Sequence, residues 1–309
     1  MIDLRTALHS ALAFPITPFD ANGDVDLDAV ATNASFLPAA GIGAIVAPSG
    51  TGEIFALTTE EAREIVAATV SVAGDTAVIA PAGFGPRVGA QMAREAEEAG
   101  AQAIMVVSPY YAKPSADGLV EYYKQIASGT SLPILPYARD SALFTPAILN
   151  RLCEELPQII AFKDGRADVR LFTQLRESVI DAQGKDRLVW IGGSGDDLVG
   201  PYFAAGAVGY TSSLACFWPE ASVEIYRLAS SGNYTGLADY HQRVVSPIYH
   251  MRQLKPGYEV SVMKAAMEIL GYVAGPSRAP LQNLDAAEMD RLAEILRVLD
   301  VPTRADRDL

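Results

Sequence analysis

Short apolar runs alternate with amphipathic segments along most of the chain. The runs predict eight buried strands, at residues 11–16, 44–47, 77–80, 103–107, 134–137, 159–163, 188–191 and 208–212. The amphipathic segments between them predict helices at 27–39, 59–73, 88–99, 118–128, 146–155, 169–180 and 196–205. A strand recurs every roughly 20 to 35 residues, which is typical of successive β/α units in a parallel sheet.

Eight β/α units in a row favour a closed (β/α)₈ TIM barrel, and an open doubly wound sheet is the alternative. Beyond residue 212 the pattern changes to helices without strands, at 219–230, 234–254, 260–270 and 286–299. The first of these completes the barrel. We therefore divide the chain into a barrel of residues 1–230 and a C-terminal helical region of residues 231–309.

Composition and charge narrow the classes of partner. The net charge of −13 argues against a nucleic-acid surface, and no basic stripe suits anionic lipid. Two cysteines without metal-ligand or redox spacing indicate a reduced, cytoplasmic location. No apolar run is long enough to span a bilayer, and the N-terminus lacks the apolar core of a signal peptide. An anionic substrate must be held by local cations or backbone amides, against the average field.

The apolar run 159–163 ends in Lys163, followed by Asp164 and Gly165. A lysine at the C-terminal end of a parallel strand faces the edge where such sheets bind ligands. Burial there would lower its pKa and leave a free amine, which is the nucleophile needed for Schiff-base formation with a ketone. The alternative is a strand-end lysine whose amine simply extends to solvent.

Other predicted strand ends carry polar side chains that would meet at the same rim. Residues 48–53 place hydroxyl groups between two glycines, so that backbone N–H groups can converge on a carboxylate; a plain glycine-rich turn is the alternative. Tyr137 ends the fifth strand, next to the strand of Lys163, where it could relay protons with help from the Thr51 hydroxyl. A tyrosine at such a position can also be a packing residue.

These positions resemble the dihydrodipicolinate synthase/N-acetylneuraminate lyase family of class I, Schiff-base-forming (β/α)₈ enzymes that act on 2-oxo acids. The matching segments are Gly50-Thr51-Gly52-Glu53, Pro109-Tyr110-Tyr111, Tyr137, Phe162-Lys163-Asp164 and Gly195-Asp196-Asp197. The resemblance implies that Lys163 forms the imine, that Tyr137 transfers protons and that Thr51 is its partner. Tyr111 matches a tyrosine that in the synthases reaches into a neighbouring subunit, which implies a homo-oligomer, a dimer or a tetramer.

Within that family the chain departs from the synthases. Gly50 replaces the first of two threonines, and Ala142 stands where the synthases have an arginine. The residues that follow Lys163, up to Asp168, and the segment 275–281 resemble the 5-dehydro-4-deoxyglucarate dehydratases instead. The substrate is then a small sugar diacid that is dehydrated and decarboxylated to 2,5-dioxopentanoate through a covalent imine on Lys163, with no other cofactor and no metal.

The resemblance also suggests how the substrate is held. Ser49, Gly50 and Thr51 would hold the carboxylate beside the imine. Candidates for the hydroxyl groups and the distal carboxylate are Arg139, Ser194 and Ser212. Arg139 lies two residues past Tyr137 and would share its face of an extended strand; alternatively it is a surface arginine paired with Asp140 or Asp168.

Three other functions remain as alternatives. A 2-oxo-acid aldolase, lyase or synthase of the same family would use the same imine but release a different product. A metal-dependent barrel would need ligands, yet the chain has only three histidines and none ends a predicted strand. A non-catalytic sugar-acid sensor would need no reactive lysine.

Overall fold

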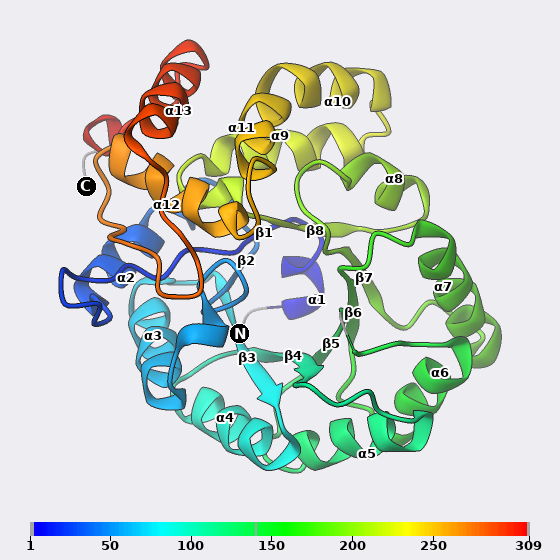
Figure 1. Ribbon diagram of the computed structural model, residues 1–309. Coiled ribbons are helices and arrows are strands. Elements are labelled where there is room, and N and C mark those ends of the chain that lie inside the picture. Colours follow the sequence, from blue (N-terminus) through cyan, green and yellow to red (C-terminus); the bar gives the residue numbers. More distant parts are fainter. Residues whose placement is uncertain (1–2, 140, 308–309) are drawn as a thin grey trace.

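The computed structural model describes residues 3–139 and 141–307. Eight parallel strands close into a barrel in chain order, and β1 also pairs with β8, which confirms the (β/α)₈ barrel (Figure 1). The strands are β1 (Ala11–Ala13), β2 (Ala44–Val46), β3 (Ala77–Phe84), β4 (Ala103–Pro109), β5 (Ile134–Ala138), β6 (Ala161–Asp164), β7 (Val189–Gly192) and β8 (Gly209–Ser212).

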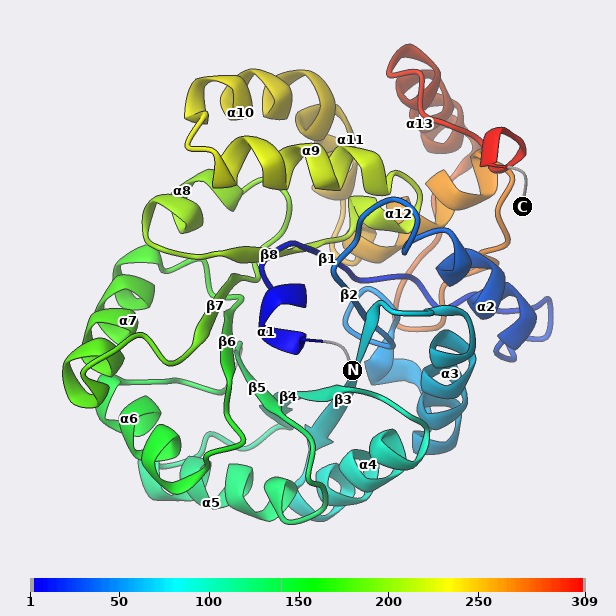
Figure 2. The ribbon, with the colours of Figure 1, turned by 180° about the vertical axis from the view of Figure 1, so that it is seen from behind.

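Helices surround the strands on the outside of the barrel (Figure 1). They are α2 (Leu27–Ser35), α3 (Thr59–Val72), α4 (Pro86–Glu98), α5 (Ala116–Ala127), α6 (Pro146–Glu155), α7 (Val169–Gln183), α8 (Val199–Ala204) and α9 (Pro219–Ser230). Capping residues fix the N-termini of several of these helices. At α3 the Thr58 hydroxyl accepts a hydrogen bond from the Glu61 N–H, and the Glu61 carboxylate accepts one from the Thr58 N–H. A short helix absent from the prediction, α1 (Leu4–Ala7), lies across the other end of the barrel (Figure 2).

The C-terminal region is helical, as predicted, but its first helix is interrupted. The predicted helix 234–254 consists of α10 (Tyr234–Tyr240), a π-helical turn (His241–Val245) and α11 (Ser246–Arg252). Pro247 at the start of α11 has no N–H to donate, which is a physical reason for the wider turn before it. Then follow α12 (Tyr258–Ile269) and α13 (Ala286–Val298).

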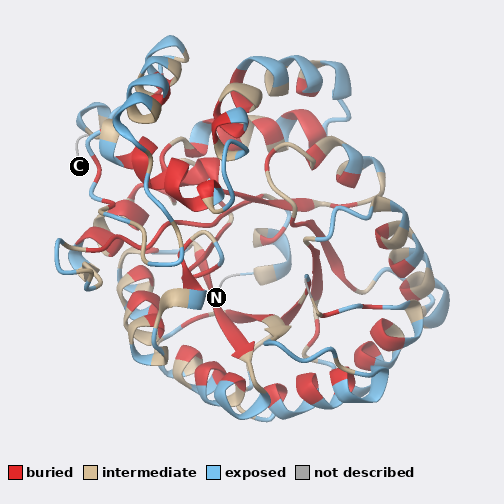
Figure 3. Cartoon of the chain, in the orientation of Figure 1, coloured by how far each residue is buried: buried red, intermediate tan, exposed pale blue. Residues whose placement is uncertain are grey.

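Apolar side chains fill the barrel and the space between barrel and helices, and Figure 3 shows buried residues on the strands and on the inner faces of the helices. One cluster joins Tyr210 and Ile225 to Tyr249 and Met263, so α11 and α12 pack directly on the barrel. The division at residue 230 stays a prediction, since this cluster crosses it. Within residues 3–139 and 141–307, no helix is both long and apolar enough to cross a membrane.

Candidate active site

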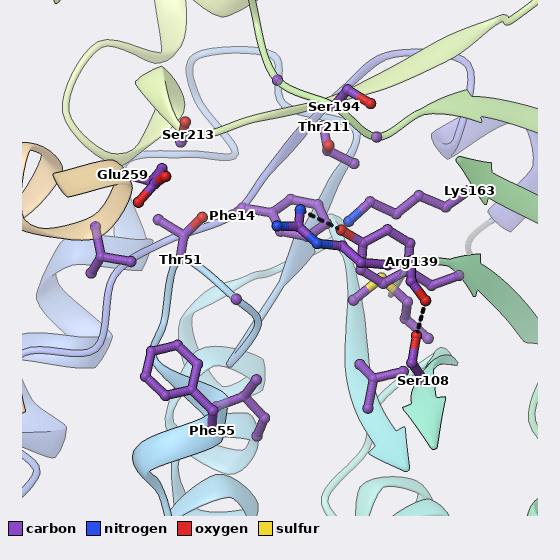
Figure 4. A pocket seen from close by; sticks show the side chains of 18 of the residues that line it. Phe14, Thr51, Phe55, Ser108, Arg139, Lys163, Ser194, Thr211, Ser213 and Glu259 are labelled. Carbon is purple, nitrogen blue, oxygen red and sulfur yellow. Dashed lines mark hydrogen bonds between the residues drawn. The ribbon is translucent and has the colours of Figure 1, made fainter. Parts of the chain in front are cut away.

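A cavity of about 940 Å³ opens at the C-terminal ends of the barrel strands (Figure 4). This is the size of an ordinary small-molecule site. Strand ends supply one part of its wall, and α11, α12 and the segment after α12 supply another. The sequence-predicted residues that line it are Gly50, Thr51, Tyr111, Tyr137, Arg139, Lys163, Ser194 and Ser212.

Lys163 on β6 presents a buried amine to this cavity. Its side chain is only 4% exposed, and Nζ lies 3.6 Å from the ring centroid of Tyr137 and 4.2 Å from that of Phe14. Burial holds the pKa of Lys163 well below its ordinary range, and the positive charge of Arg139 lowers this pKa further, while the Asp164 carboxylate opposes the change. The environment therefore favours the neutral amine, the form that attacks a carbonyl carbon.

Tyr137 on β5 lies directly beside Lys163, because the two residues are register partners in neighbouring strands. The Tyr137 hydroxyl oxygen accepts a hydrogen bond from Arg139 Nη1 at 3.3 Å (Figure 4). This contact places the Arg139 guanidinium against the hydroxyl group that is predicted to transfer protons. Thr51 lines the same cavity, and its role as partner of Tyr137 stays a prediction.

Two glycines make room for the pair. At Gly165 an added Cβ would lie 2.6 Å from Tyr137 Cε2, and at Gly193 it would lie 2.7 Å from Lys163 Cε. Both are closer than van der Waals contact allows. The two side chains therefore lie against backbone that must lack a Cβ.

The loop after β2 contributes Gly50 and Thr51 to the cavity wall, while Gly52 lies behind it. No acceptor among the described residues takes the N–H groups of Gly50, Thr51 or Gly52, and the loop is held from behind by the Thr17 hydroxyl, which donates to the Gly52 carbonyl oxygen at 2.7 Å. Such a run of unpaired amides is suited to a carboxylate. Ser49 lies differently, since its side chain is fully buried and forms no part of the cavity wall.

The predicted distal residues reach the cavity, but two of them are engaged within the protein. The Ser212 hydroxyl donates to Asp196 and accepts from the Ala215 N–H at 3.1 Å. The Ser194 hydroxyl contacts the Tyr202 hydroxyl at 3.1 Å and accepts from the Ala167 N–H at 3.1 Å. These bonds position the rim and leave the two hydroxyl groups less capacity for a ligand.

Tyr111 lies at the mouth of the cavity and is 94% exposed. Its φ of 65° lies in the left-handed region, which is uncommon for a residue with a side chain. Tyr110 beside it is 76% exposed, so two aromatic rings project from this edge. The role of Tyr111 toward a neighbouring subunit stays a prediction. Asp140, one of the partners predicted for Arg139, lies outside the described residues.

Sequence reasoning missed the part of the wall that comes from the C-terminal helices. Arg252 at the end of α11 lines the cavity. Glu259 on α12 also lines it, and Phe14, Thr211 and Ser213 join from strand ends (Figure 4). The two charged residues reach the rim through the packing of α11 and α12 on the barrel, and no spacing or motif announces this contact. Phe14 lies inside the predicted first strand, 11–16, but directly follows the shorter observed β1, and this is why the prediction did not place it at the rim.

No group of three or more His, Cys, Asp and Glu side chains is placed to hold a metal ion, as far as the described residues go. Cys153 and Cys216 are buried, and burial raises the pKa of their thiols to about 11 and about 12. The expectation that the reaction uses no metal and no separate cofactor stays a prediction.

The fold and this cavity define a (β/α)₈-barrel protein with a buried lysine amine at the C-terminal rim. Residues 7–299 match the model of the dihydrodipicolinate synthetase family, and the chain belongs to that family as one of its lyases. Among curated proteins it is 36% identical to a probable 5-dehydro-4-deoxyglucarate dehydratase of Rhodococcus jostii, over 93% of each chain. It is 35% identical to a protein of the same name from Rhodococcus opacus, again over 93% of each chain.

Solved structures agree with the fold. The dihydrodipicolinate synthase of Bacillus clausii superposes with a TM-score of 0.88 at 28% identity, covering 96% of this chain and all of that one (100%). A prophage protein of the dihydrodipicolinic acid synthase family from Escherichia coli K12, solved in complex with pyruvate, gives a TM-score of 0.84 at 26% identity and covers 94% of this chain and 99% of that one.

Proposed function

We propose that this protein is a decarboxylating dehydratase that converts 5-dehydro-4-deoxyglucarate to 2,5-dioxopentanoate, carbon dioxide and water. The observation that carries the proposal is the buried amine of Lys163, which lies against Tyr137 and lines the same cavity as Gly50 and Thr51, whose amides have no partner among the described residues. The names of the curated relatives support this choice of substrate.

The first half of the reaction forms the imine and expels a hydroxyl group. Lys163 Nζ attacks the ketone carbon next to one carboxylate, and loss of water gives a protonated imine. The amides of Gly50 and Thr51 hold that carboxylate. Tyr137 then takes a proton from the neighbouring CH₂, and the electron pair forms an enamine. The enamine expels the hydroxyl group on the next carbon, which leaves with a proton as water and leaves an unsaturated imine.

The second half removes the distal carboxylate. The electron pair of the carbon–carbon bond to that carboxylate flows into the unsaturated imine, and carbon dioxide departs. The product is an enol conjugated to an enamine, and protonation on carbon turns it into an aldehyde and an imine. Water then hydrolyses the imine and returns Lys163, so that the net products are one dioxo acid, one carbon dioxide and one water.

Product analysis tests the proposal directly. Incubation with 5-dehydro-4-deoxyglucarate is expected to release carbon dioxide and 2,5-dioxopentanoate. An aldolase or synthase of the same family would instead release or consume pyruvate, and pyruvate in place of carbon dioxide would overturn the assignment. A sensor would bind the sugar acid without turnover.

Borohydride reduction with a 2-oxo acid tests the covalent step. We expect added mass on the peptide that contains Lys163, and none after Lys163→Met. Lys185→Met, which changes an exposed lysine, is the matched control and should label normally. Mass on another lysine, or full turnover by Lys163→Met, would contradict the imine mechanism.

We also propose that the protein forms a homo-oligomer in which a second copy covers the exposed pair Tyr110 and Tyr111. Two large aromatic side chains projecting side by side from one edge are unusual on a surface that stays in water. Sedimentation velocity tests this proposal, and a monomer at micromolar concentration would contradict it.

A further inference from the structure

The proposed substrate carries a second carboxylate that the amides of Gly50 and Thr51 cannot hold. Because the chain has a net charge of −13, this carboxylate needs a local cation near the cavity. Besides Lys163, three cations of the described residues line the cavity: Lys113, which is exposed near its mouth, Arg139 after β5, and Arg252 at the end of α11. We compare the two arginines, because a planar guanidinium can give a carboxylate two parallel hydrogen bonds. Their surroundings differ, and the difference separates their roles.

Arg252 is held in place by contacts on two sides. Its Nη1 donates to the Ser213 hydroxyl at 2.9 Å, and its guanidinium carbon lies 4.3 Å from the ring centroid of Tyr249. Tyr249 is fixed in turn, because its hydroxyl donates to the buried Asp196 carboxylate at 2.7 Å. The same carboxylate accepts from the Ser213 N–H at 3.2 Å. The guanidinium is therefore oriented before any ligand arrives.

Arg252 also keeps binding capacity. No carboxylate of the described residues lies within 4.0 Å of its nitrogens, the limit for an ion pair, and its Nη2 donates to none of those residues and is not buried, unlike Nε. The nearby Asp196 and Asp197 act on it only through space. A partly buried, oriented guanidinium with unused donors and no direct counter-ion is well suited to a carboxylate.

Arg139 is already engaged with the reacting groups. Its Nη1 donates to the Tyr137 hydroxyl, its charge lowers the pKa of Lys163, and its side chain is exposed. Glu259 on α12 also lines the cavity and lies on the side of Ser213 (Figure 4), so Arg252 has to outweigh its negative charge for an anion to bind there. A second carboxylate therefore gains most from the cation whose position is fixed independently of Lys163 and Tyr137.

We propose that Arg252, together with the Ser213 hydroxyl, binds the carboxylate at the far end of the substrate from the imine and so selects diacids. This inference rests on the proposed function for the identity of the substrate. It assigns Arg139 to the chemistry around Lys163 and Tyr137, and Arg252 to recognition.

The test compares two 2-oxo acids of equal length by borohydride trapping on Lys163. 2-Oxoadipate has the six-carbon skeleton of the proposed substrate with a carboxylate at each end, and 2-oxohexanoate lacks the second carboxylate. The wild-type protein should trap half-maximally at a lower concentration of 2-oxoadipate. Arg252→Gln should raise that concentration about ten- to a hundredfold for 2-oxoadipate, which is the effect of losing a charge-assisted hydrogen bond, and leave 2-oxohexanoate unchanged.

Two further variants sharpen the result. Arg252→Lys keeps the charge but loses the planar pair of donors, and should lose affinity for 2-oxoadipate by less than Arg252→Gln. Arg243→Gln removes an exposed charge of the π-helical turn that is not part of the cavity wall, and should trap both acids like the wild type.

Each contrary outcome has a definite meaning. Equal losses for both acids in Arg252→Gln would show a structural role, and no loss for either would show that Arg252 does not contact the distal carboxylate. A loss specific to 2-oxoadipate in Arg139→Gln, with Arg252→Gln normal, would move the subsite to Arg139. Trapping requires neither dehydration nor decarboxylation. Absence of carbon dioxide release with diacid selection intact would thus refute the proposed function and leave the role of Arg252 standing.

Discussion

Alanine at position 193 is expected to displace the nucleophilic amine while leaving its chemistry unchanged. A Cβ on residue 193 would lie 2.7 Å from both Cγ and Cε of Lys163 and 2.7 Å from the Asp164 carbonyl oxygen, whereas ordinary contacts begin at 3.4 Å. The carbonyl oxygen belongs to β6 and cannot move far, so residue 193 and the lysine chain have to separate by about 0.7 Å, the difference between 3.4 and 2.7 Å. A displacement approaching 1 Å at a reacting group lowers rates by about a hundredfold.

The assay for Gly193→Ala is the rate of imine trapping with pyruvate and borohydride, compared with kcat/KM for the proposed substrate. Both should fall together, because both need the amine in place. Gly85→Ala is the matched control, since a Cβ there meets nothing within 4 Å and the backbone at φ −142° accepts any residue. Overpacking also destabilises, by about 1–3 kcal/mol, so urea unfolding accompanies the kinetics. A folded Gly193→Ala with an unchanged trapping rate would refute the reasoning.

Four other outcomes are expected. Tyr137→Phe should fold normally and lose about 10²–10⁴-fold in turnover, the usual contribution of a proton-transferring group, and a loss below about tenfold would indicate a packing role. Lys163→Met should be more stable than wild type to urea at pH 7, because unfolding lets this lysine regain its proton in the wild-type protein. The gain in stability should shrink as the pH rises toward 10.5, where the unfolded lysine also loses its proton. A variant less stable than wild type at every pH would contradict this reasoning. EDTA should leave turnover unchanged, whereas a loss restored by a divalent ion would indicate a metal-dependent reaction. Tyr111→Ala should weaken self-association measured by sedimentation, and an unchanged assembly would argue that Tyr111 serves only its own subunit.

The barrel could be predicted because its strands are buried on both faces and therefore appear in the sequence as continuous apolar runs. The boundaries were less accurate, since pairing with neighbours decides where a strand ends. Thus β3 continues to Phe84, four residues past the prediction, while β1 ends at Ala13. The helix predicted from Asp196 begins only at Val199. Asp196 is instead a buried acceptor for Ser212, Tyr249 and nearby amides, a role that depends on residues far away in the sequence.

In the site, too, local sequence patterns predicted some residues, whereas contacts between distant segments decided the others. Lys163 and Tyr137 each end a predicted strand and Thr51 follows one, so all three could be placed at one rim, because the C-terminal ends of parallel strands share one edge. The hydrogen bond of Tyr137 to Arg139 depends on side-chain conformations that no pattern encodes. The contribution of Arg252 depends on how α11 docks, which is a non-local packing result.

A buried ion pair shows that the C-terminal helices also support the anion-binding loop from behind. Glu53 ends that loop with a fully buried side chain, and its carboxylate lies 2.7 Å from Nζ of the equally buried Lys264 on α12. The Glu53 carboxylate also accepts a hydrogen bond from the backbone N–H of Arg278, which follows α12 in the chain, at 2.8 Å. Removing one partner from a buried pair costs about 3–5 kcal/mol, because the other charge is left without compensation. The amides of residues 50–52 therefore keep their arrangement only while α12 is in place. Since α11 carries Arg252, the region after residue 230 supports both ends of the proposed substrate site.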